Sequence, residues 1–230
     1  MKTKIILTFF IIFFHALSQS AIAQDYCNSE GKTLTAYFAP RLGAVNQEVK
    51  NYQSGIEAVF LKLQVGDKLE VLIAHDAGVA KSFSACFPGC PPQGILNQFI
   101  GLGGSCKATL ADRDKINFKR TFVSSVKRTL EDAQDGNLGY KNILKTLGAI
   151  KAHEKSTPTT NQNTYLVSSM FNKPDIDRDE ADAFFVSVVQ GKDMLDEFPE
   201  LQVLGIPLNP DLISVWTDLY AVNGQNFDYR

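Results

Sequence analysis

The sequence predicts an α/β fold with a mostly parallel central sheet and helices on both of its faces, a Rossmann-like arrangement. Two observations predict it. Residues 33–38 and 69–73 are short β-rich runs, and a helical segment lies between them. Because parallel strands need a long crossover, this order is typical of a parallel pair. Helix-like and strand-like segments then recur to the end of the chain, as they do where helices cover both faces of a sheet.

The first connecting helix is expected over residues 45–63. Its apolar residues recur at steps of mostly three and four, which is the spacing of one helix face. They are Val45, Val49, Tyr52, Ile56, Val59, Phe60 and Leu63. Gly66 ends this segment, and the strand after it is largely apolar, which is typical of a strand buried on both faces.

No regular pattern is recognisable over residues 77–113, which hold three cysteines and three prolines. A loop of this length inside a compact domain is usually either functional or cross-linked. The cysteines favour the second reading, so we expect a Cys-rich loop that disulfides hold in place.

Further helices and strands are expected in the C-terminal half. A helix that begins at Asp112 or Asp114 has Ile116, Phe122, Val126 and Leu130 on its apolar face. The other expected elements are a helix over residues 140–150, a strand over 164–171, a helix or strand over 182–190, a strand over 200–208, a helix over 211–223 that stops at Gly224, and an edge strand over 225–230.

The first 23 residues have the three parts of a secretory signal peptide. Lys2 and Lys4 precede an apolar run over residues 5–14, and a small-x-small site ends at Ala23. We therefore expect residues 1–23 to be a signal peptide and residues 24–230 to be a single α/β domain, periplasmic or secreted. No second long apolar run follows, so we expect no membrane span after signal cleavage.

The charge balance excludes one class of partner. The chain has 23 basic and 25 acidic residues, and the expected signal peptide holds two lysines and no acid, so the exported domain would have a net charge of −4. No basic run is recognisable, and the sequence therefore predicts no binding to nucleic acid.

Four cysteines lie in the expected mature chain: Cys27, Cys86, Cys90 and Cys106. An even number in an exported protein indicates two disulfides, and three pairings are open. Cys86 and Cys90 are spaced CxxxC in a proline-rich turn, which differs from the CxxC of thioredoxin-like redox sites. A structural cross-link is the favoured role.

In layout, the chain resembles a von Willebrand factor A-like domain. The matching segments are a strand that leads into a long helix, then "VGDKLEVLIAHDAG", and later "TYLVSSM" and "LQVLGIPL" followed by "VWTDLYAVNG". The resemblance spans roughly residues 33–230 apart from the Cys-rich loop. It implies the α/β fold and a binding role rather than catalysis.

The metal site of that family has no counterpart in this chain. The family places an Asp-x-Ser-x-Ser after its first strand and an aspartate after its fourth, and their oxygens bind Mg²⁺. Here the first strand exits through "YFAPRLGA", and Ser168 and Ser169 stand where the acid would be. We therefore expect no metal and no cofactor.

Two enzymatic alternatives stay open. His75 lies at the end of a strand, where α/β sites collect, so a hydrolase could pair it with a serine or cysteine of the Cys-rich loop. A thiol-disulfide oxidoreductase would use the cysteines themselves.

The leading interpretation is an exported, non-enzymatic binding or scaffold protein of the cell envelope, accessory to a secretion or surface assembly. Its partner would be an envelope or surface protein. The surface for that partner is expected at the carboxyl-terminal edge of the sheet. The candidate residues there are Pro40, Arg41, His75, Asp76, Phe87, Asn172 and Asp175.

Overall fold

The computed structural model describes residues 26–27, 31–90, 108–157, 162–173, 177–190, 198–199, 201–206 and 209–229. Within them, six strands form one sheet: β1 (Thr33–Ala39), β2 (Lys68–His75), β3 (Gly78–Cys86), β4 (Gln162–Ser168), β5 (Gln202–Leu204) and β6 (Asp228–Tyr229). The helices are α2 (Asn46–Phe60), α4 (Ala108–Gln134), α5 (Ile143–Ser156), α6 (Arg178–Gln190) and α7 (Pro210–Val222).

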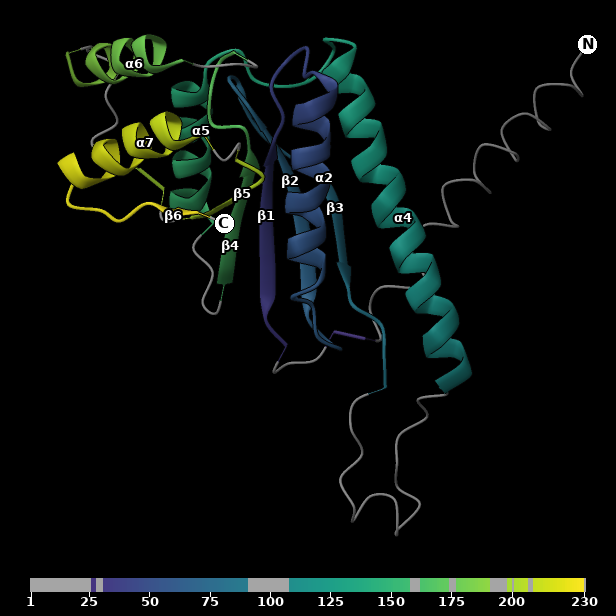
Figure 1. Ribbon diagram of the computed structural model, residues 1–230. Coiled ribbons are helices and arrows are strands. Elements are labelled where there is room, and N and C mark those ends of the chain that lie inside the picture. The colour runs from purple at the N-terminus through teal and green to yellow at the C-terminus, as the bar shows by residue number, and fades with distance from the viewer. Residues whose placement is uncertain are drawn as a thin grey trace, which may run out of the picture.

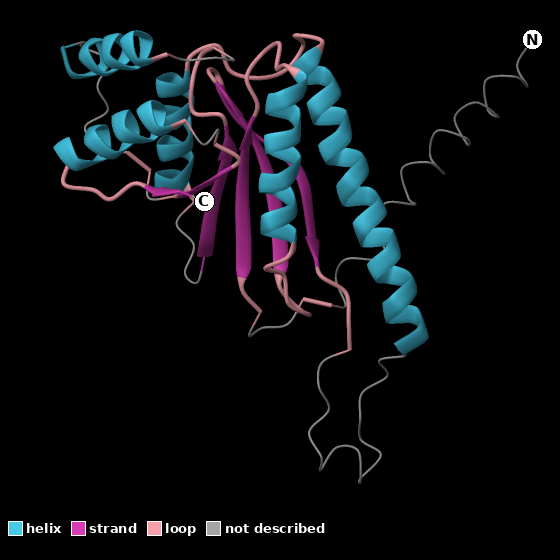
Figure 2. Cartoon of the chain, in the orientation of Figure 1, coloured by secondary structure: helices cyan, strands magenta, loops and turns pink. Residues whose placement is uncertain are grey.

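The strand order is β3-β2-β1-β4-β5-β6. All neighbouring strands pair in parallel except β2 and β3, which are antiparallel. The predicted fold class, a mostly parallel sheet between helices, is confirmed (Figures 1 and 2).

Helices cover the sheet on both faces because successive side chains of a strand point to opposite sides. Leu34, Ala36 and Phe38 of β1 pack in one core with α2 and α4. Tyr37 and Ala39 of the same strand pack in the other core with α5, α6 and α7. Figure 1 shows the same division, with α2 beside α4 and the other three helices grouped together.

Gly55 allows α2 to lie close to the sheet. A Cβ atom at this position would stand 2.9 Å from Cγ1 of Val167 on β4 and 3.2 Å from the backbone nitrogen of Gly205. The first distance is shorter than real Cβ atoms show and the second is tighter than most, so any residue other than glycine would force a shift of the helix or its neighbours.

The largest difference from the prediction is β3. Residues 78–86 were expected to belong to the Cys-rich loop, yet they pair with β2 in a hairpin whose register joins His75 to Gly78 across a two-residue turn. Among the nine residues of β3, only Phe83 and Cys86 are buried. An edge strand this exposed gives no continuous apolar signal, which is why its pattern is hard to recognise.

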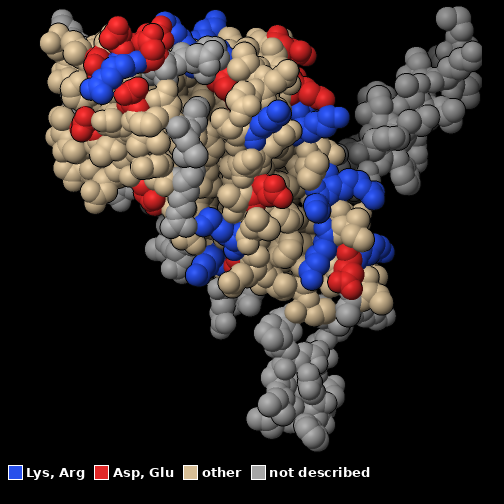
Figure 3. Space-filling model, in the orientation of Figure 1, with Lys and Arg blue, Asp and Glu red and all other residues tan. Residues whose placement is uncertain are grey.

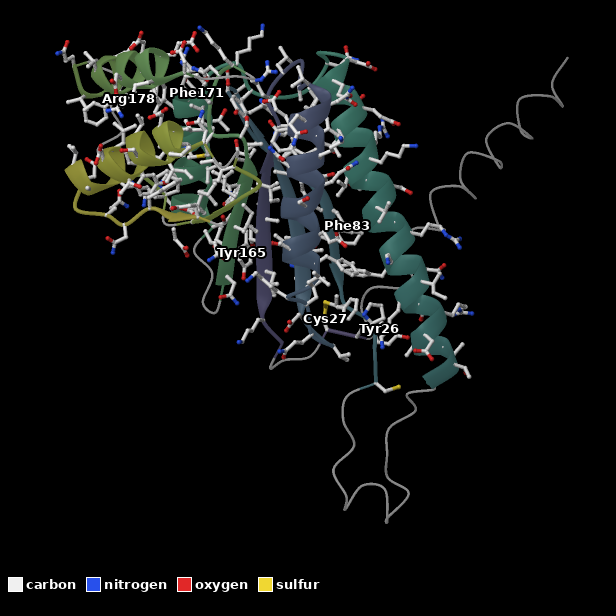
Figure 4. The ribbon with its side chains drawn as sticks, in the orientation of Figure 1. Tyr26, Cys27, Phe83, Tyr165, Phe171 and Arg178 are labelled. Atoms are coloured by element: carbon white, nitrogen blue, oxygen red, sulfur yellow. A yellow bond between two sulfur atoms is a disulfide. The ribbon has the colours of Figure 1, made fainter. Side chains whose placement is uncertain are left out.

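Because β3 is antiparallel to β2, its end at Cys86 lies at the edge of the sheet opposite the expected one. Cys86 pairs with Lys68 at the start of β2, so the chain leaves β3 at the amino-terminal edge of the parallel strands. Figure 4 shows the two edges at opposite ends of the sheet, with Tyr26 and Cys27 near one and Phe171 near the other. Residues 86–90 therefore lie at the amino-terminal edge rather than at the carboxyl-terminal edge where they were expected.

Two interactions hold the described N-terminal residues against the body. Cys27 is disulfide-bonded to Cys86, with a Cα–Cα distance of 5.2 Å, and the hydroxyl of Tyr26 donates to Oδ2 of Asp114 on α4 at 2.7 Å. Cys90 is also disulfide-bonded. Cys86 and Cys90 are therefore not partners of one another, and Cys106 lies outside the described residues.

The remaining elements follow the predicted order. Residues 182–190, which fitted a helix or a strand, belong to helix α6, whose Ala181 and Val188 face the core at a spacing of seven. Ile116 was expected on the buried face of its helix and is instead 59% exposed, because α4 buries Phe118 and Phe122. No helix within the described ranges is long and apolar enough to cross a membrane. The expected signal peptide lies outside those ranges.

Candidate functional site

The carboxyl ends of β1 and β4 lie side by side, with Ala39 paired to Ser168. At this edge Arg41 forms a bidentate ion pair with Glu48, the third residue of α2. Nε donates to Oε1 at 2.9 Å, and Nη2 donates to Oε2 at 2.6 Å. The side chains are only 11% and 3% exposed, and the hydrogen bonds that Arg41 donates to Glu48 raise the pKa of Arg41.

Two further N–H groups of Arg41 are also occupied. Its guanidinium donates to the carbonyl oxygens of Leu42 and Gly43, each at 3.1 Å. Glu48 in turn accepts from the backbone nitrogen of Val45 at 2.9 Å, which satisfies a free amide at the start of α2. The ion pair thus holds the β1–α2 loop against the first turn of the helix.

Two buried tyrosines connect this loop to the end of β4. The hydroxyl of Tyr52 donates to Oγ of Ser169 at 3.0 Å and accepts from the backbone nitrogen of Arg41 at 3.1 Å. The hydroxyl of Tyr140 lies 2.9 Å from the same Oγ and donates to the carbonyl oxygen of Phe171 at 2.8 Å. Burial raises the pKa of Tyr52, and it raises that of Tyr140 to about 12, so both hydroxyls stay neutral and can donate.

The backbone after β4 is fixed by side chains as well. Oγ of Ser168 accepts from the nitrogen of Met170 at 3.1 Å, and the carbonyl oxygen of Met170 accepts from Nε1 of Trp216 at 2.9 Å. Met170 has a φ of 59°, in the left-handed region that residues other than glycine seldom adopt. These bonds stabilise that conformation at the position where the sheet ends.

Asp76 and Asn172 hold the start of α5. Oδ1 of Asp76 accepts from the backbone nitrogens of Lys141 and Asn142, each at 3.1 Å, and Oδ1 of Asn172 accepts from that of Ile143 at 2.8 Å. The amides at a helix N-terminus have no partner within the helix, so these contacts are structural caps. Both side chains were candidates for a partner surface, and both are engaged within the chain.

The remaining candidates lie apart from one another. Pro40 is buried, and His75 is half-buried with Nδ1 3.3 Å from the nitrogen of Ala77 that donates to it. Phe87 lies at the opposite edge and packs edge-on against Phe60 of α2 and Phe118 of α4. Asp175 lies outside the described residues.

No nucleophile is brought to His75 by the part of the loop that the structure describes. Ser82, the nearer of the two serines, lies at the bulge opposite Val71 and Leu72, at least three residues along β2 from His75, which is roughly 10 Å for an extended strand. Its Oγ lies 2.7 Å from Oγ of Ser125 on α4. Ser84 is farther, since it pairs with Glu70, five residues from His75. Cys86 and Cys90 are disulfide-bonded. Within the described ranges, no three His, Cys, Asp or Glu side chains converge as a metal site would require.

An open hollow of about 600 Å³ lies at the amino-terminal edge, beside the starts of β4 and β5. Its lining is polar and includes Gln202, Gln225 and Asp228. Nε2 of Gln202 donates to Oδ2 of Asp228, and the amide of Gln225 bonds both backbone groups of Phe198. These polar groups bind one another, so the hollow offers no distinct ligand set.

The most exposed mixed surface is the outer face of α4, the stripe Arg113, Ile116, Arg120, Val123 and Lys127. These residues follow one another at steps of three and four, on the exposed side of the helix that borders the buried face of Phe118, Phe122, Val126 and Leu130. Ile116 and Val123 are 59% and 50% exposed, and Arg113 and Lys127 are more exposed still. Figure 3 shows basic side chains gathered along this helix.

This surface was not predicted from the sequence because its cations are spread over about four helical turns rather than contiguous. Their spacing of seven residues, from Arg113 to Arg120 to Lys127, was the available signal, and Ile116 and Val123 share it.

No model of a known protein family matches the sequence, and no curated protein matches it significantly. What the chain does must therefore be inferred from its own side chains and their arrangement.

Proposed function

We propose that the protein is an exported, non-enzymatic binding protein of the cell envelope and that it holds a protein partner on the outer face of α4. The observation that carries this proposal is the exposure of Ile116 and Val123 between the cations of that face. Arginine is enriched in protein interfaces, and exposed apolar groups in line with it offer area to bury.

The carboxyl-terminal edge of the sheet is less suited to this role. Ligands in α/β proteins commonly bind at this edge, where polar groups point into a crevice. Here Arg41, Glu48, Tyr52, Tyr140 and Ser169 bond to one another, and a ligand would have to break bonds that the fold already makes. This favours a framework role for the edge and argues against catalysis there.

The Cys27–Cys86 disulfide supports export, because disulfides form and persist in oxidising compartments. The resemblance to von Willebrand factor A-like domains is likewise a proposal. It is supported by the adjacency of the β1 and β4 exits, the two places from which that family takes metal ligands. In this chain those exits carry the Arg41 ion pair and Ser168–Ser169, so no metal is proposed.

The binding function is tested by comparing three immobilised forms of the protein in extract from the source cells. One is unaltered, one combines Ile116→Asp with Val123→Asp, and a control combines Leu61→Asp with Val222→Asp at two exposed sites outside α4. We expect the same protein to be recovered by the first and third, and at least about tenfold less by the second if that protein is a different chain. If it is a further copy of this chain, its own α4 face can still dock on α6 of the immobilised form, and we expect the second form to recover about half as much. Equal recovery by all three forms, or no specific recovery, would refute the proposal.

Export is tested separately by N-terminal sequencing of the protein recovered from cells. A mature chain that starts at Gln24 is the expected result, and an intact Met1 in the folded protein would refute it.

A further inference from the structure

We propose that the protein associates with itself head to tail, with the outer face of α4 in one copy docked on the outer face of α6 in the next. The inference rests on the proposed function and names the partner, a second copy of this chain. Two faces of opposite charge, both carrying exposed β-branched residues, motivate it.

The α4 stripe carries three cations, Arg113, Arg120 and Lys127, and no acid. The whole helix has six cations and four acids, so its net charge is 6 − 4 = +2, and the acids lie near its two ends. Asp114 is buried and accepts from the hydroxyl of Tyr26, so it faces away from the outer stripe. At the ends of the stripe Arg113 pairs with Asp114 and Lys127 with the exposed Glu131.

The outer face of α6 has the complementary character. Asp179, Asp182, Val186 and Val189 follow one another at steps of three and four, so they lie along one side of the helix. Val186 and Val189 are 46% and 39% exposed. Arg178 is the cation beside these acids, and it interacts with both Asp182 and Asp211 at 3.6 Å.

The two faces match in length as well as in charge. The α4 stripe runs from Arg113 to Lys127, roughly 21 Å along a helix axis, and the α6 stripe runs from Asp179 to Val189, roughly 15 Å. The acidic stripe therefore fits within the basic one, and the valines of α6 can meet Ile116 or Val123 while the aspartates meet the cations.

One copy cannot bring its own two faces together. The buried side of α4 belongs to the core on one face of the sheet, and that of α6 belongs to the core on the other. Figure 3 shows acidic side chains over α6 and basic side chains over α4 on separate parts of the molecule. Contact between the two faces is heterologous, so it repeats from copy to copy unless its rotation closes a ring.

An anionic membrane is the competing occupant of the α4 face. Membrane-surface helices usually carry Trp, Phe or Leu on their apolar side, whereas this stripe offers Ile and Val between its cations. The acidic stripe on α6 supplies a partner of the right charge within the same protein, which favours self-association.

A charge-swap experiment on the purified, disulfide-bonded protein tests this inference. Variant one carries Arg120→Glu and Lys127→Glu, and variant two carries Asp179→Lys and Asp182→Lys. By sedimentation velocity at about 50 mM salt, we expect the unaltered protein to associate in a concentration-dependent way. We expect the affinity of this association to be about tenfold weaker at about 300 mM salt. Each variant alone should be monomeric.

An equimolar mixture of the two variants gives the decisive result. Variant one keeps the acidic α6 face and variant two keeps the basic α4 face, so the native contact can form between them. The two reversed faces, acidic on α4 of variant one and basic on α6 of variant two, are complementary as well. The expected result is that the mixture associates, with the two variants alternating, although each alone is monomeric. A control with Lys50→Glu and Lys145→Glu has the same charge change as variant one at exposed sites elsewhere and should associate like the unaltered protein.

A mixture that stays monomeric overturns the inference, and so does an unaltered protein that is monomeric at every concentration. Binding of the monomeric protein to phosphatidylglycerol vesicles through α4 would assign the face to a membrane instead and would also overturn it. If self-association fails while the Ile116→Asp/Val123→Asp protein still loses a different protein partner, the inference falls and the proposed function stands.

Discussion

Arg41 and Glu48 form a buried bidentate ion pair where β1 ends and α2 begins. The pair holds the β1–α2 loop, and Glu48 also caps the helix because it accepts a hydrogen bond from the amide of Val45 at the start of α2. Through Tyr52 and Ser169, the same cluster reaches the end of β4. It therefore joins the two central strands of the sheet at one edge.

Replacing Glu48 should lower the free energy of unfolding more than replacing a carboxylate of an exposed ion pair. Glu48→Gln leaves the guanidinium of Arg41 in a largely buried site without its counter-charge, which we expect to cost about 2–4 kcal/mol of unfolding free energy. Urea unfolding followed by circular dichroism measures this. Glu131→Gln breaks the exposed pair with Lys127 and serves as the matched control, with an expected cost below about 0.5 kcal/mol. Equal losses would contradict a supporting role for the buried pair.

Alkaline pH should destabilise the protein through its buried tyrosines. The pKa of Tyr140 is raised to about 12, so this hydroxyl stays protonated in the folded state while the unfolded chain already loses its proton near pH 10. The protonated Tyr140 hydroxyl contributes to the free energy of unfolding. This contribution is fully present below about pH 10 and is lost as the pH rises toward about 12, at about 1.4 kcal/mol per pH unit. Tyr140→Phe should be less stable at pH 7, because the bond to Phe171 is lost, yet its stability should fall less steeply above pH 10.

The disulfide pattern is directly testable. Peptide mapping without reduction should recover Cys27 linked to Cys86, and the even number of cysteines then leaves Cys90 and Cys106 as the second pair. Replacing Cys27 and Cys86 together by serine should cost about 2–4 kcal/mol, because the bond closes a loop of 59 residues in the unfolded chain. Recovery of a Cys86–Cys90 peptide would contradict the structure.

Gly55→Ala should destabilise the protein even though alanine favours helices. Its methyl group would meet Val167 at 2.9 Å and the backbone around Gly205, so α2 would have to shift by an amount that we expect to cost about 1–3 kcal/mol. Ser54→Ala, at the neighbouring exposed position, adds the same residue without a contact and should be neutral or slightly stabilising. Thermal unfolding compares the two, and a stabilised Gly55→Ala protein would show that the close approach is absent.

The sequence predicted those elements that have one continuous apolar face. The apolar stripe of α2 and the apolar run of β2 both indicate burial. Tyr52, Ile56 and Val59 of the stripe are buried as expected, whereas Val45 and Leu63 at its ends lie outside the helix and Val45 is exposed. The edge strand β3 was missed because a half-exposed strand has little apolar repeat, although the Asp-Ala-Gly turn before it was a hairpin signal. Ile116 was assigned to the wrong face because one apolar residue in a charged helix does not define a stripe.

The cluster at the carboxyl-terminal edge could not have been predicted. Tyr52 and Ser169 are 117 residues apart in the chain, and Tyr140 and Ser169 are 29 apart, so their contact depends on how the strands pair. Arg41 and Glu48 are close in sequence, yet an ion pair of that spacing is common on exposed surfaces as well. Only the burial that the fold imposes gives these residues their role.

The most direct test of the binding role is photo-cross-linking from α4 in living cells. A benzoyl-phenylalanine at position 123 lies on the outer face of α4, and the same group at position 222 lies at the exposed end of α7. The account predicts one discrete protein adduct from position 123 and none from position 222. No adduct from position 123, or the same adducts from both positions, would contradict it.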